Sequence, residues 1–253
     1  MTVRRPRGVV LAGVVVTVAL MLGACGGSKA IKSSERPLTS EEASTLADAL
    51  YLNWQDQGAT FTANAAWTSI GRTIAMQGEV DWRTGTGHAL VRAMGADTGL
   101  SEVWWNGTVV VERWPAIETI LSGLGYTNAK YLSRAPDPEK RLVDHVIAVV
   151  SGLAAPQREN PLLIQQTPGS AFVRHDDLRG SSIDVLRYGE RSLYWIAVDT
   201  SRMLRFDGNA SSGTAPTVVD LLTTGPQTIT PPPRDTIIPT SSIASVYRGL
   251  TGG

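Results

Sequence analysis

The stretch TFTANAAWTSIGRTIAMQGEVDW, residues 60–82, alternates apolar and polar side chains on both sides of a turn. Apolar residues take every second position before the turn and again after it, and this period of two is typical of strands with one buried face. Gly71 lies between the two runs, where a tight turn favours a residue with wide backbone freedom. The stretch therefore predicts two adjacent antiparallel strands that share one apolar face.

The alternation continues beyond this pair. Residues 59–114 contain about five such runs, separated by turns at 83–87 and 95–99. Asn106-Gly107 stands between the last two runs, and this dipeptide is a strong hairpin signal because both residues tolerate positive φ. We therefore expect a meander that ends in a hairpin with a type I′ turn.

Helices are predicted before and after the meander. Thr39 and Glu42 have the spacing of a capping box, and the apolar residues that follow at helical spacing predict a helix over about 40–55. A short helix is expected over about 115–124, and Asp137-Pro138 predicts the start of another. The apolar stripe of this last helix consists of Leu142, Val143, Val146, Ile147 and Val150.

A second series of strands follows from about residue 171, with a last strand within 218–230 that the prolines at 231–233 end. The total is about nine or ten strands. We therefore predict one α+β domain over residues 38–233, with helices on a broad antiparallel sheet, and a C-terminal tail over 234–253.

The first residues have the pattern of an export signal. Three arginines precede an uncharged run, Val9 to Leu22, that is too short to cross a bilayer comfortably. The order Leu-Gly-Ala-Cys at 22–25 resembles the lipobox of bacterial lipoproteins, in which cleavage precedes the cysteine and its thiol carries a diacylglyceryl group with acyl chains such as palmitate. The resemblance implies a signal peptide over 1–24, lipid attachment at Cys25 and a position on the outer face of the cell membrane. The alternative is a structural cysteine after an uncleaved anchor.

Cys25 is the only cysteine, so the chain has no internal disulfide. The Gly-rich and Ser-rich residues after it predict a flexible tether over 25–37. Removal of residues 1–24 takes away three arginines and leaves 20 basic against 23 acidic side chains. This balance does not favour nucleic acid as a partner.

No arrangement of side chains predicts catalysis or metal binding. His88, His145 and His175 are far apart in sequence, and none has a second ligand at the spacing of a metal site. His175 is followed by two aspartates, but neighbouring residues of a strand point to opposite faces, which favours a solvated strand end. We expect no enzyme activity, no catalytic residue, no metal and no cofactor.

Seven tryptophans occur along the predicted helix and strands, at 54, 67, 82, 104, 105, 114 and 195. Aromatic side chains of this kind fill a core, form a stacking surface or line a cavity. Most are expected in the core, and the flexible methionines would suit an adaptable cavity wall.

Three stretches resemble actinobacterial lipoproteins of the LppX and LprG group, which are relatives of the lipoprotein carrier LolA. These are MQGEVDWRTGTGHALV, LYWIAVDTSRMLRF and TVVDLLTTGPQTITPPP, at 76–91, 193–206 and 217–233. The resemblance implies an unclosed half β-barrel with helices packed in its concavity and a cavity that takes acyl chains. It further implies a lipid or lipoglycan ligand, and we expect an envelope transporter as a partner.

The alternation within the strands and the helix stripe give candidate positions for the cavity wall. They are Ile74, Met76, Val80, Trp82, Val143, Val146, Ile147 and Val150. The competing hypothesis is a structural or interaction lipoprotein whose core is filled by these same side chains. An apolar space well above roughly 300 Å³ would favour a ligand.

Overall fold

A computed structural model describes residues 35–67, 71–94, 99–208 and 217–251 of the 253-residue chain. All of them belong to one compact unit, residues 33–253. The predicted signal peptide and Cys25 lie outside the described residues. Of the helices within these ranges, none has the length and apolar character needed to span a membrane.

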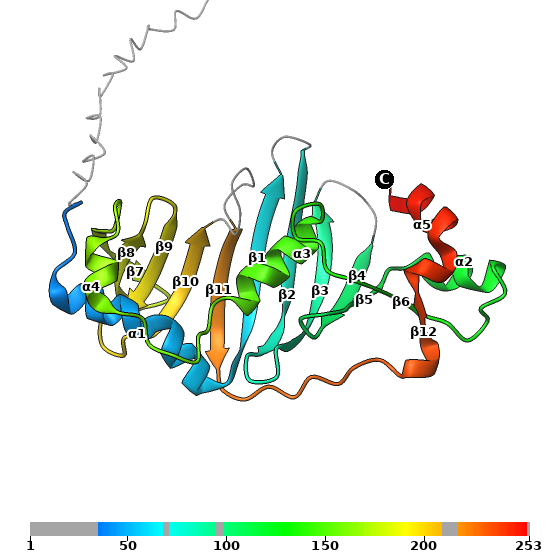
Figure 1. The fold of residues 1–253 in the computed structure, drawn as a ribbon, viewed down its shortest axis with the longest axis horizontal. Coiled ribbons are helices and arrows are strands. Elements are labelled where there is room, and N and C mark those ends of the chain that lie inside the picture. Colours follow the sequence, from blue (N-terminus) through cyan, green and yellow to red (C-terminus); the bar gives the residue numbers. More distant parts are fainter. Residues whose placement is uncertain (1–34, 68–70, 95–98, 209–216, 252–253) are drawn as a thin grey trace, which may run out of the picture. The chain divides into compact units, whose positions relative to one another are not determined.

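Twelve strands form one sheet, in the order β12-β6-β5-β4-β3-β2-β1-β11-β10-β9-β8-β7 (Figure 1). Neighbouring strands are antiparallel, except that β12 runs parallel to β6. The bounds are β1 Gly58–Trp67, β2 Arg72–Asp81, β3 Thr86–Met94, β4 Leu100–Trp105, β5 Val110–Arg113, β6 Tyr131–Arg134, β7 Ala171–Leu178, β8 Ser181–Tyr188, β9 Ser192–Ala197, β10 Met203–Gly208, β11 Thr217–Thr224 and β12 Ile237–Pro239. Because β7 and β12 form opposite edges, the sheet is open, and the predicted α+β class with an unclosed curved sheet is confirmed.

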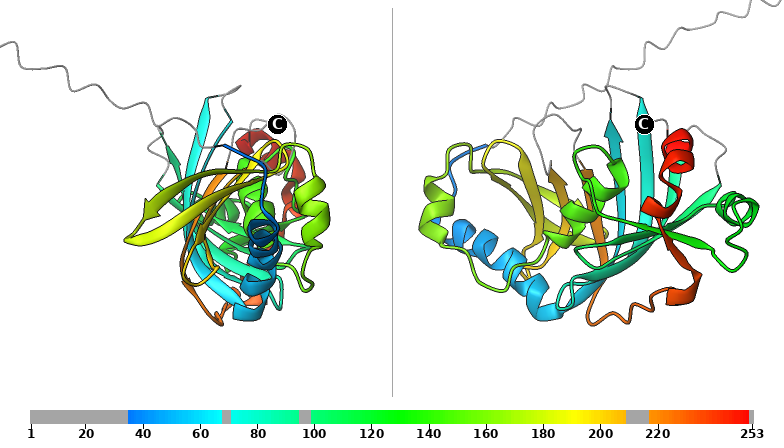
Figure 2. Two further views of the ribbon diagram at one scale, coloured as in Figure 1. Left: turned by 90° about the vertical axis from the view of Figure 1, so that its left-hand side faces the viewer. Right: turned by 45° about the vertical axis from the view of Figure 1, so that its right-hand side comes forward.

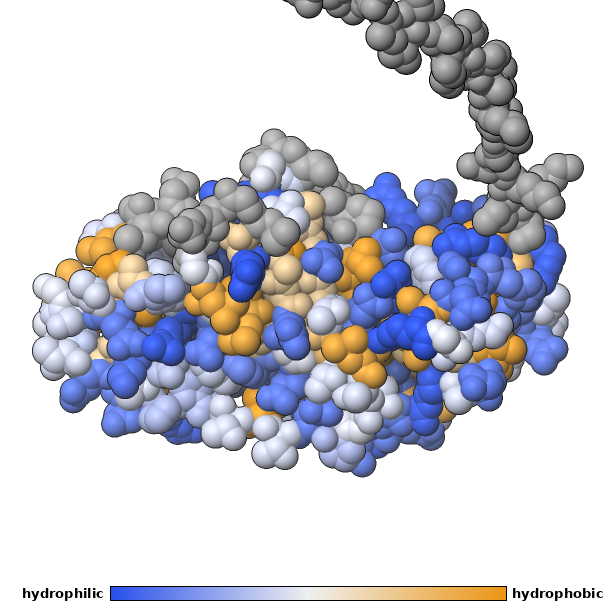
Figure 3. Space-filling model, turned by 180° about the vertical axis from the view of Figure 1, so that it is seen from behind, coloured by the Kyte–Doolittle hydropathy of each residue, from blue (hydrophilic) through white to orange (hydrophobic). Residues whose placement is uncertain are grey.

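Figure 2 shows how the strands curve around the helices. The helices are α1 Ser40–Asp56, α2 Ile117–Gly123, α3 Leu142–Ser151, α4 Pro161–Gln166 and α5 Ala244–Thr251. α1 packs against β1, β9 and β10, whereas α3 packs against β1, β2 and β11. The largest hydrophobic cluster lies between these helices and the sheet, on the face to which Phe61 and Met76 point. The opposite face is largely hydrophilic, with separate apolar patches (Figure 3).

The capping box of α1 is present as predicted. The Glu42 amide donates to the Thr39 hydroxyl at 3.2 Å, and the Thr39 amide donates to the Glu42 carboxylate at 2.9 Å. Glu42 also accepts two hydrogen bonds from the Arg36 guanidinium. These bonds, together with those from Thr39, hold the pKa of Glu42 below its ordinary value. These contacts fix the start of α1 against the residues that precede it.

A second hydrophobic cluster covers the other end of the sheet. It joins α2, β6 and the C-terminal residues through Ile117, Leu121, Ala129, Leu132, Ile243 and Tyr247. The segment after residue 233, which we predicted as a tail of the domain, contributes β12 and α5 here. Its strand pairs with β6 from Ile237 to Pro239, so the sheet extends past the predicted range of 38–233.

Three local predictions are corrected. α3 begins at Leu142 rather than at Pro138, because the backbone of Asp137 instead closes a turn with the amides of Lys140 and Arg141. The hairpin at Asn106-Gly107 is present, but only Gly107 has positive φ, so its turn is not type I′. The strand count is 12 rather than nine or ten, since the short β6 and β12 were not predicted.

Candidate functional site

The eight residues predicted to line a cavity are brought together by the fold. Seven are buried in the main cluster, and Val143 is partly buried and packs against it. The indole Nε1 of Trp82 donates to the Val150 carbonyl at 3.0 Å, which joins the end of β2 to the end of α3. The two predicted walls are therefore in contact, as a filled core requires. That a ligand enters between them stays a prediction.

A buried ion pair fixes the other end of α3. The Arg134 guanidinium donates to both carboxylate oxygens of Asp144, at 2.5 and 2.8 Å, and also to Glu112 at 3.0 Å. Burial alone would lower the pKa of Arg134, but the bonds to these two carboxylates outweigh it and raise that pKa. Tyr247 donates to Glu112 at 2.5 Å. Burial, and to a smaller extent the nearby Glu112 carboxylate, raises the pKa of Tyr247 to about 12. The network connects β5, β6, α3 and α5.

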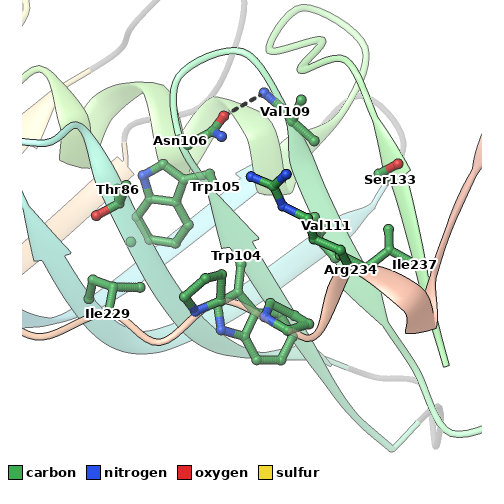
Figure 4. Close-up of a pocket in the computed structure, with 13 residues that line it drawn as sticks. Thr86, Trp104, Trp105, Asn106, Val109, Val111, Ser133, Ile229, Arg234 and Ile237 are labelled. Atoms are coloured by element: carbon green, nitrogen blue, oxygen red, sulfur yellow. Dashed lines mark hydrogen bonds between the residues drawn. The ribbon is translucent and has the colours of Figure 1, made fainter.

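A pocket of about 470 Å³ lies at one end of strands β3 to β5, where the chain after β11 crosses them (Figure 4). Its walls are mostly apolar. They consist of Thr86, Gly87, Trp104, Trp105, Asn106, Val109, Val111, Ser133, Ile229, Pro231, Pro232, Arg234 and Ile237. None of the eight predicted cavity residues belongs to this pocket.

Two neighbouring tryptophans of β4 form the aromatic part of the wall. Because side chains alternate along a strand, Trp105 points to the core face and Trp104 to the opposite one, and the pocket reaches both at the strand ends. A Cβ on Gly87 would lie 2.0 Å from the Trp105 ring, so the absent side chain lets this indole lie on the backbone of β3. Trp105 also contacts Phe61 edge-on, with centroids 6.5 Å apart.

Trp104 is fixed on three sides. It stacks on His88 with centroids 4.6 Å apart and meets Tyr131 edge-on at 5.4 Å. Its Nε1 donates to the Thr230 carbonyl at 3.1 Å, so this indole joins β4 to the crossing segment. The pocket therefore has a preformed aromatic wall.

Two donors at the pocket lack partners. Within the described part of the chain, the guanidinium of Arg234 has no hydrogen-bond or salt-bridge partner, and the buried Nε1 of Trp105 has no acceptor. Figure 4 shows the Arg234 side chain extending over Val111 toward the turn at Asn106. An apolar cleft with a cation at its rim suits an amphipathic ligand that carries an anionic group.

The turn beside the pocket is held by the Asn106 side chain. Its Oδ1 accepts from the amide of Thr108 at 3.3 Å and from the amide of Val109 at 3.0 Å. Gly107, with φ of 83°, supplies the one left-handed residue of this loop. The loop therefore presents Val109 to the pocket in a defined position.

The three histidines remain apart in the fold. His88 lies under Trp104, His145 is fully buried in α3, and the side chain of His175 is 76% exposed and bonds Asp184 at 2.6 Å. A hydrogen bond from the backbone amide of Asp177, and to a smaller extent one from the Arg174 guanidinium, lowers the pKa of Asp176. The described residues contain no group of three or more His, Cys, Asp and Glu that could hold a metal ion.

Only part of this pocket was visible in the sequence. Trp104 and Trp105 were among the tryptophans considered for a cavity wall, but Ile229, Arg234 and Ile237 were not considered. Ile229 lies just before the prolines that were expected to end the sheet, and Arg234 and Ile237 lie beyond them. Arg234, which follows three consecutive prolines, was the one feature of the sequence that could have pointed to this pocket.

No protein-family model and no curated protein matches the chain. Among solved structures, an uncharacterized conserved protein from Thermus thermophilus has 10% identity and a TM-score of 0.39, over 77% of this chain and 96% of that one. The MucA/MucB complex of Pseudomonas aeruginosa gives 13% identity and a TM-score of 0.32, over 75% of this chain and 57% of that one.

An outer membrane lipoprotein-sorting protein domain from Vibrio parahaemolyticus gives 7% identity and a TM-score of 0.31, over 77% of this chain and 96% of that one. The structural neighbours thus include a lipoprotein-sorting domain at low identity. Because every TM-score is below 0.5, these likenesses carry no argument about function. The LppX and LprG resemblance, the lipid ligand and the envelope transporter stay predictions.

Proposed function

We propose that this chain is a lipoprotein of the cell envelope, of the LppX and LprG type, that is anchored through an acylated Cys25. Its folded domain binds an amphipathic lipid without catalysis. The apolar chain of the ligand contacts Trp104 and Val111, and its anionic group lies beside Arg234. The observation that carries this proposal is the pocket of about 470 Å³, whose mostly apolar wall has an unpaired guanidinium at its rim.

The volume supports a small ligand or part of a larger one. Sites for small molecules occupy about 300–1,000 Å³ and combine apolar walls with a few polar groups. Burial of about eight methylenes contributes roughly 6 kcal/mol, which is close to the roughly 4–15 kcal/mol that association costs. A charged contact is therefore needed for useful affinity, and Arg234 is the group placed to provide it.

A second candidate function follows from the packed core. Seven of the eight residues of the predicted cavity are buried in one hydrophobic cluster and Val143 packs against it, as the structural or interaction lipoprotein of the competing hypothesis requires. In that case the pocket would bind no lipid, and the domain would act through its surface. The two functions differ in whether an amphipathic probe binds at Arg234.

Titration with a fluorescent single-chain carboxylic acid, such as dansyl-undecanoic acid, separates them. We expect saturable binding by the chain from residue 26 onward, weakened about 10- to 100-fold by Arg234→Gln, because bonds to a charged group contribute about 1.5–3 kcal/mol. Arg191→Gln is the matched control, since Arg191 is also exposed and has no described partner. Equal affinities of the two variants, or no saturable binding, would contradict the proposal.

A further inference from the structure

The short helix α4 carries two neighbouring leucines that face water. Leu162 and Leu163 are 62% and 61% exposed. Among the described side chains, no other large apolar one is as exposed. The next residue, Ile164, is buried in the main cluster. α4 is therefore fixed by one apolar side chain and presents two others outward.

The orientation of α4 is set by hydrogen bonds. Asn160 caps the helix by accepting from the Leu162 amide at 3.0 Å, and Pro161 occupies its first position. The Gln165 amide group donates to the Leu38 carbonyl at 3.0 Å, so the helix is bonded to the residues that lead into α1. The two leucines are thus held on an ordered support rather than on a loop.

α4 lies at the end of the unit where the described chain begins (Figure 1). There, Arg36 exchanges two backbone hydrogen bonds with Phe172 of β7, at 3.0 and 2.9 Å. Glu35, the first described residue, pairs with Arg187 of β8. Glu35, which Cys25 precedes by ten positions, is therefore fixed at this end of the sheet.

Covalent geometry limits how far Cys25 is from this point. Glu35 is ten positions after Cys25, and an extended chain covers at most about 3.6 Å per position, or roughly 36 Å. A membrane that holds an acylated Cys25 is consequently always within this reach of Glu35. Because this short connection keeps the membrane close to α4, its effective concentration there is high. Even a weak apolar contact between α4 and the membrane then forms.

We propose that Leu162 and Leu163 insert into the interface of the membrane that carries the acylated Cys25, and so orient the domain on it. This inference rests on the proposed acylation of Cys25. The surrounding charges favour apolar insertion over attraction to anionic lipid, because three nearby arginines pair with carboxylates and Arg191, which has no described partner, follows Glu190 in the sequence. These pairs are Arg158 with Asp48, Arg187 with Glu35 and Arg36 with Glu42.

The test uses the full lipidated chain in phosphatidylcholine vesicles. Acylation consumes the native thiol, so Leu163→Cys introduces a single reactive thiol for an environment-sensitive NBD label. Leu124→Cys is the matched control, because Leu124 is also an exposed leucine but follows α2 in the region covered by the second cluster. We expect a blue-shifted emission and several-fold stronger quenching by spin-labelled lipid at 163 than at 124.

Equal quenching at the two positions would overturn the inference. Retention of the Leu163→Cys emission shift in high salt supports apolar insertion, and its loss would overturn it. Labelling of the unsubstituted protein would show a free Cys25 thiol, and this outcome refutes the anchor and the inference together. Binding of the fluorescent acid at Arg234 is measured separately, so failure of membrane insertion and failure of the pocket proposal are distinguishable.

Discussion

Arg134 and Asp144 form a bidentate ion pair that is almost completely withdrawn from water, with side-chain exposures of 6% and 0%. The pair joins β6 to α3, and Asp144 also accepts the backbone amide of Asp137 at 2.6 Å. It therefore fixes the start of the helix whose far end is bonded to Trp82. α3 is held on the sheet at both ends by polar contacts and between them by apolar packing.

Asp144→Ala is expected to lower the free energy of unfolding by about 3–5 kcal/mol, because it leaves a buried guanidinium without its main partner. Urea unfolding measures this loss. Glu118→Ala is the control, since Glu118 pairs with Arg113 where both side chains are 42% exposed. An exposed pair contributes about 0–1 kcal/mol, so similar losses in the two variants would contradict the assigned role.

His145 is expected to make stability fall as the medium becomes acidic. Burial lowers the pKa of this imidazole below its ordinary value, and neither ring nitrogen has a partner among the described residues. The unfolded chain takes up the proton as pH falls through about 6.5, whereas the folded chain does so only at lower pH. The free energy of unfolding should therefore decrease from about pH 6.5 down to the lowered pKa.

Unfolding free energies measured from about pH 7.5 to pH 5 test this sign. His145→Leu should flatten the decrease, because it removes the group that binds the extra proton. His175→Leu, at the exposed histidine, should retain it. An unchanged pH slope in His145→Leu would show that other groups cause the decrease.

Gly78→Ala is expected to disturb the centre of the sheet. Its Cβ would lie 2.1 Å from the His88 carbonyl oxygen and 2.7 Å from Ala89 Cα, and these backbone atoms have little room to move. Overpacking of this kind costs about 1–3 kcal/mol or more. Gly123→Ala in α2 meets nothing within 4 Å and should stabilise by about 0.5–1 kcal/mol. Thermal unfolding of both variants checks the opposite signs.

Asn106→Ala is expected to lower the free energy of unfolding by about 1–2 kcal/mol, because the amides of Thr108 and Val109 lose their acceptor. Asn64→Ala serves as the control, since Asn64 is exposed on β1 and makes no described side-chain hydrogen bond. Amide exchange at Val109 reports the loss at the turn itself. Unchanged protection of that amide would show that the side chain does not hold the loop.

The central strands and the first helix were predictable because their signals are local. The period of two around Gly71 gave β1 and β2, and Thr39 with Glu42 gave the start of α1. α3 was found by its apolar stripe, but its start was misplaced. Asp137-Pro138 resembles a helix start in the sequence. In the structure these two residues lie in a turn, because the Asp137 amide donates to the Asp144 carboxylate that is paired with Arg134. No local sequence rule reveals this pair.

The pocket was largely unpredictable, because it depends on contacts between distant segments. β12 has three residues, and only its pairing with Tyr131 to Ser133 makes it a strand. Arg234 reaches the pocket because the chain around the prolines lies against β4, where the Thr230 carbonyl before them accepts a hydrogen bond from Trp104. The sequence revealed the tryptophans, but it did not show which segment lies against them.

The location of a bound ligand tests the central claim most directly. A diazirine-bearing fatty acid, irradiated with the protein and followed by peptide mass spectrometry, identifies the residues that the apolar chain contacts. We predict attachment within residues 104–111 and 229–237, and its loss in Arg234→Gln. Attachment within α3, at residues 142–151, or an absence of specific attachment would contradict the account.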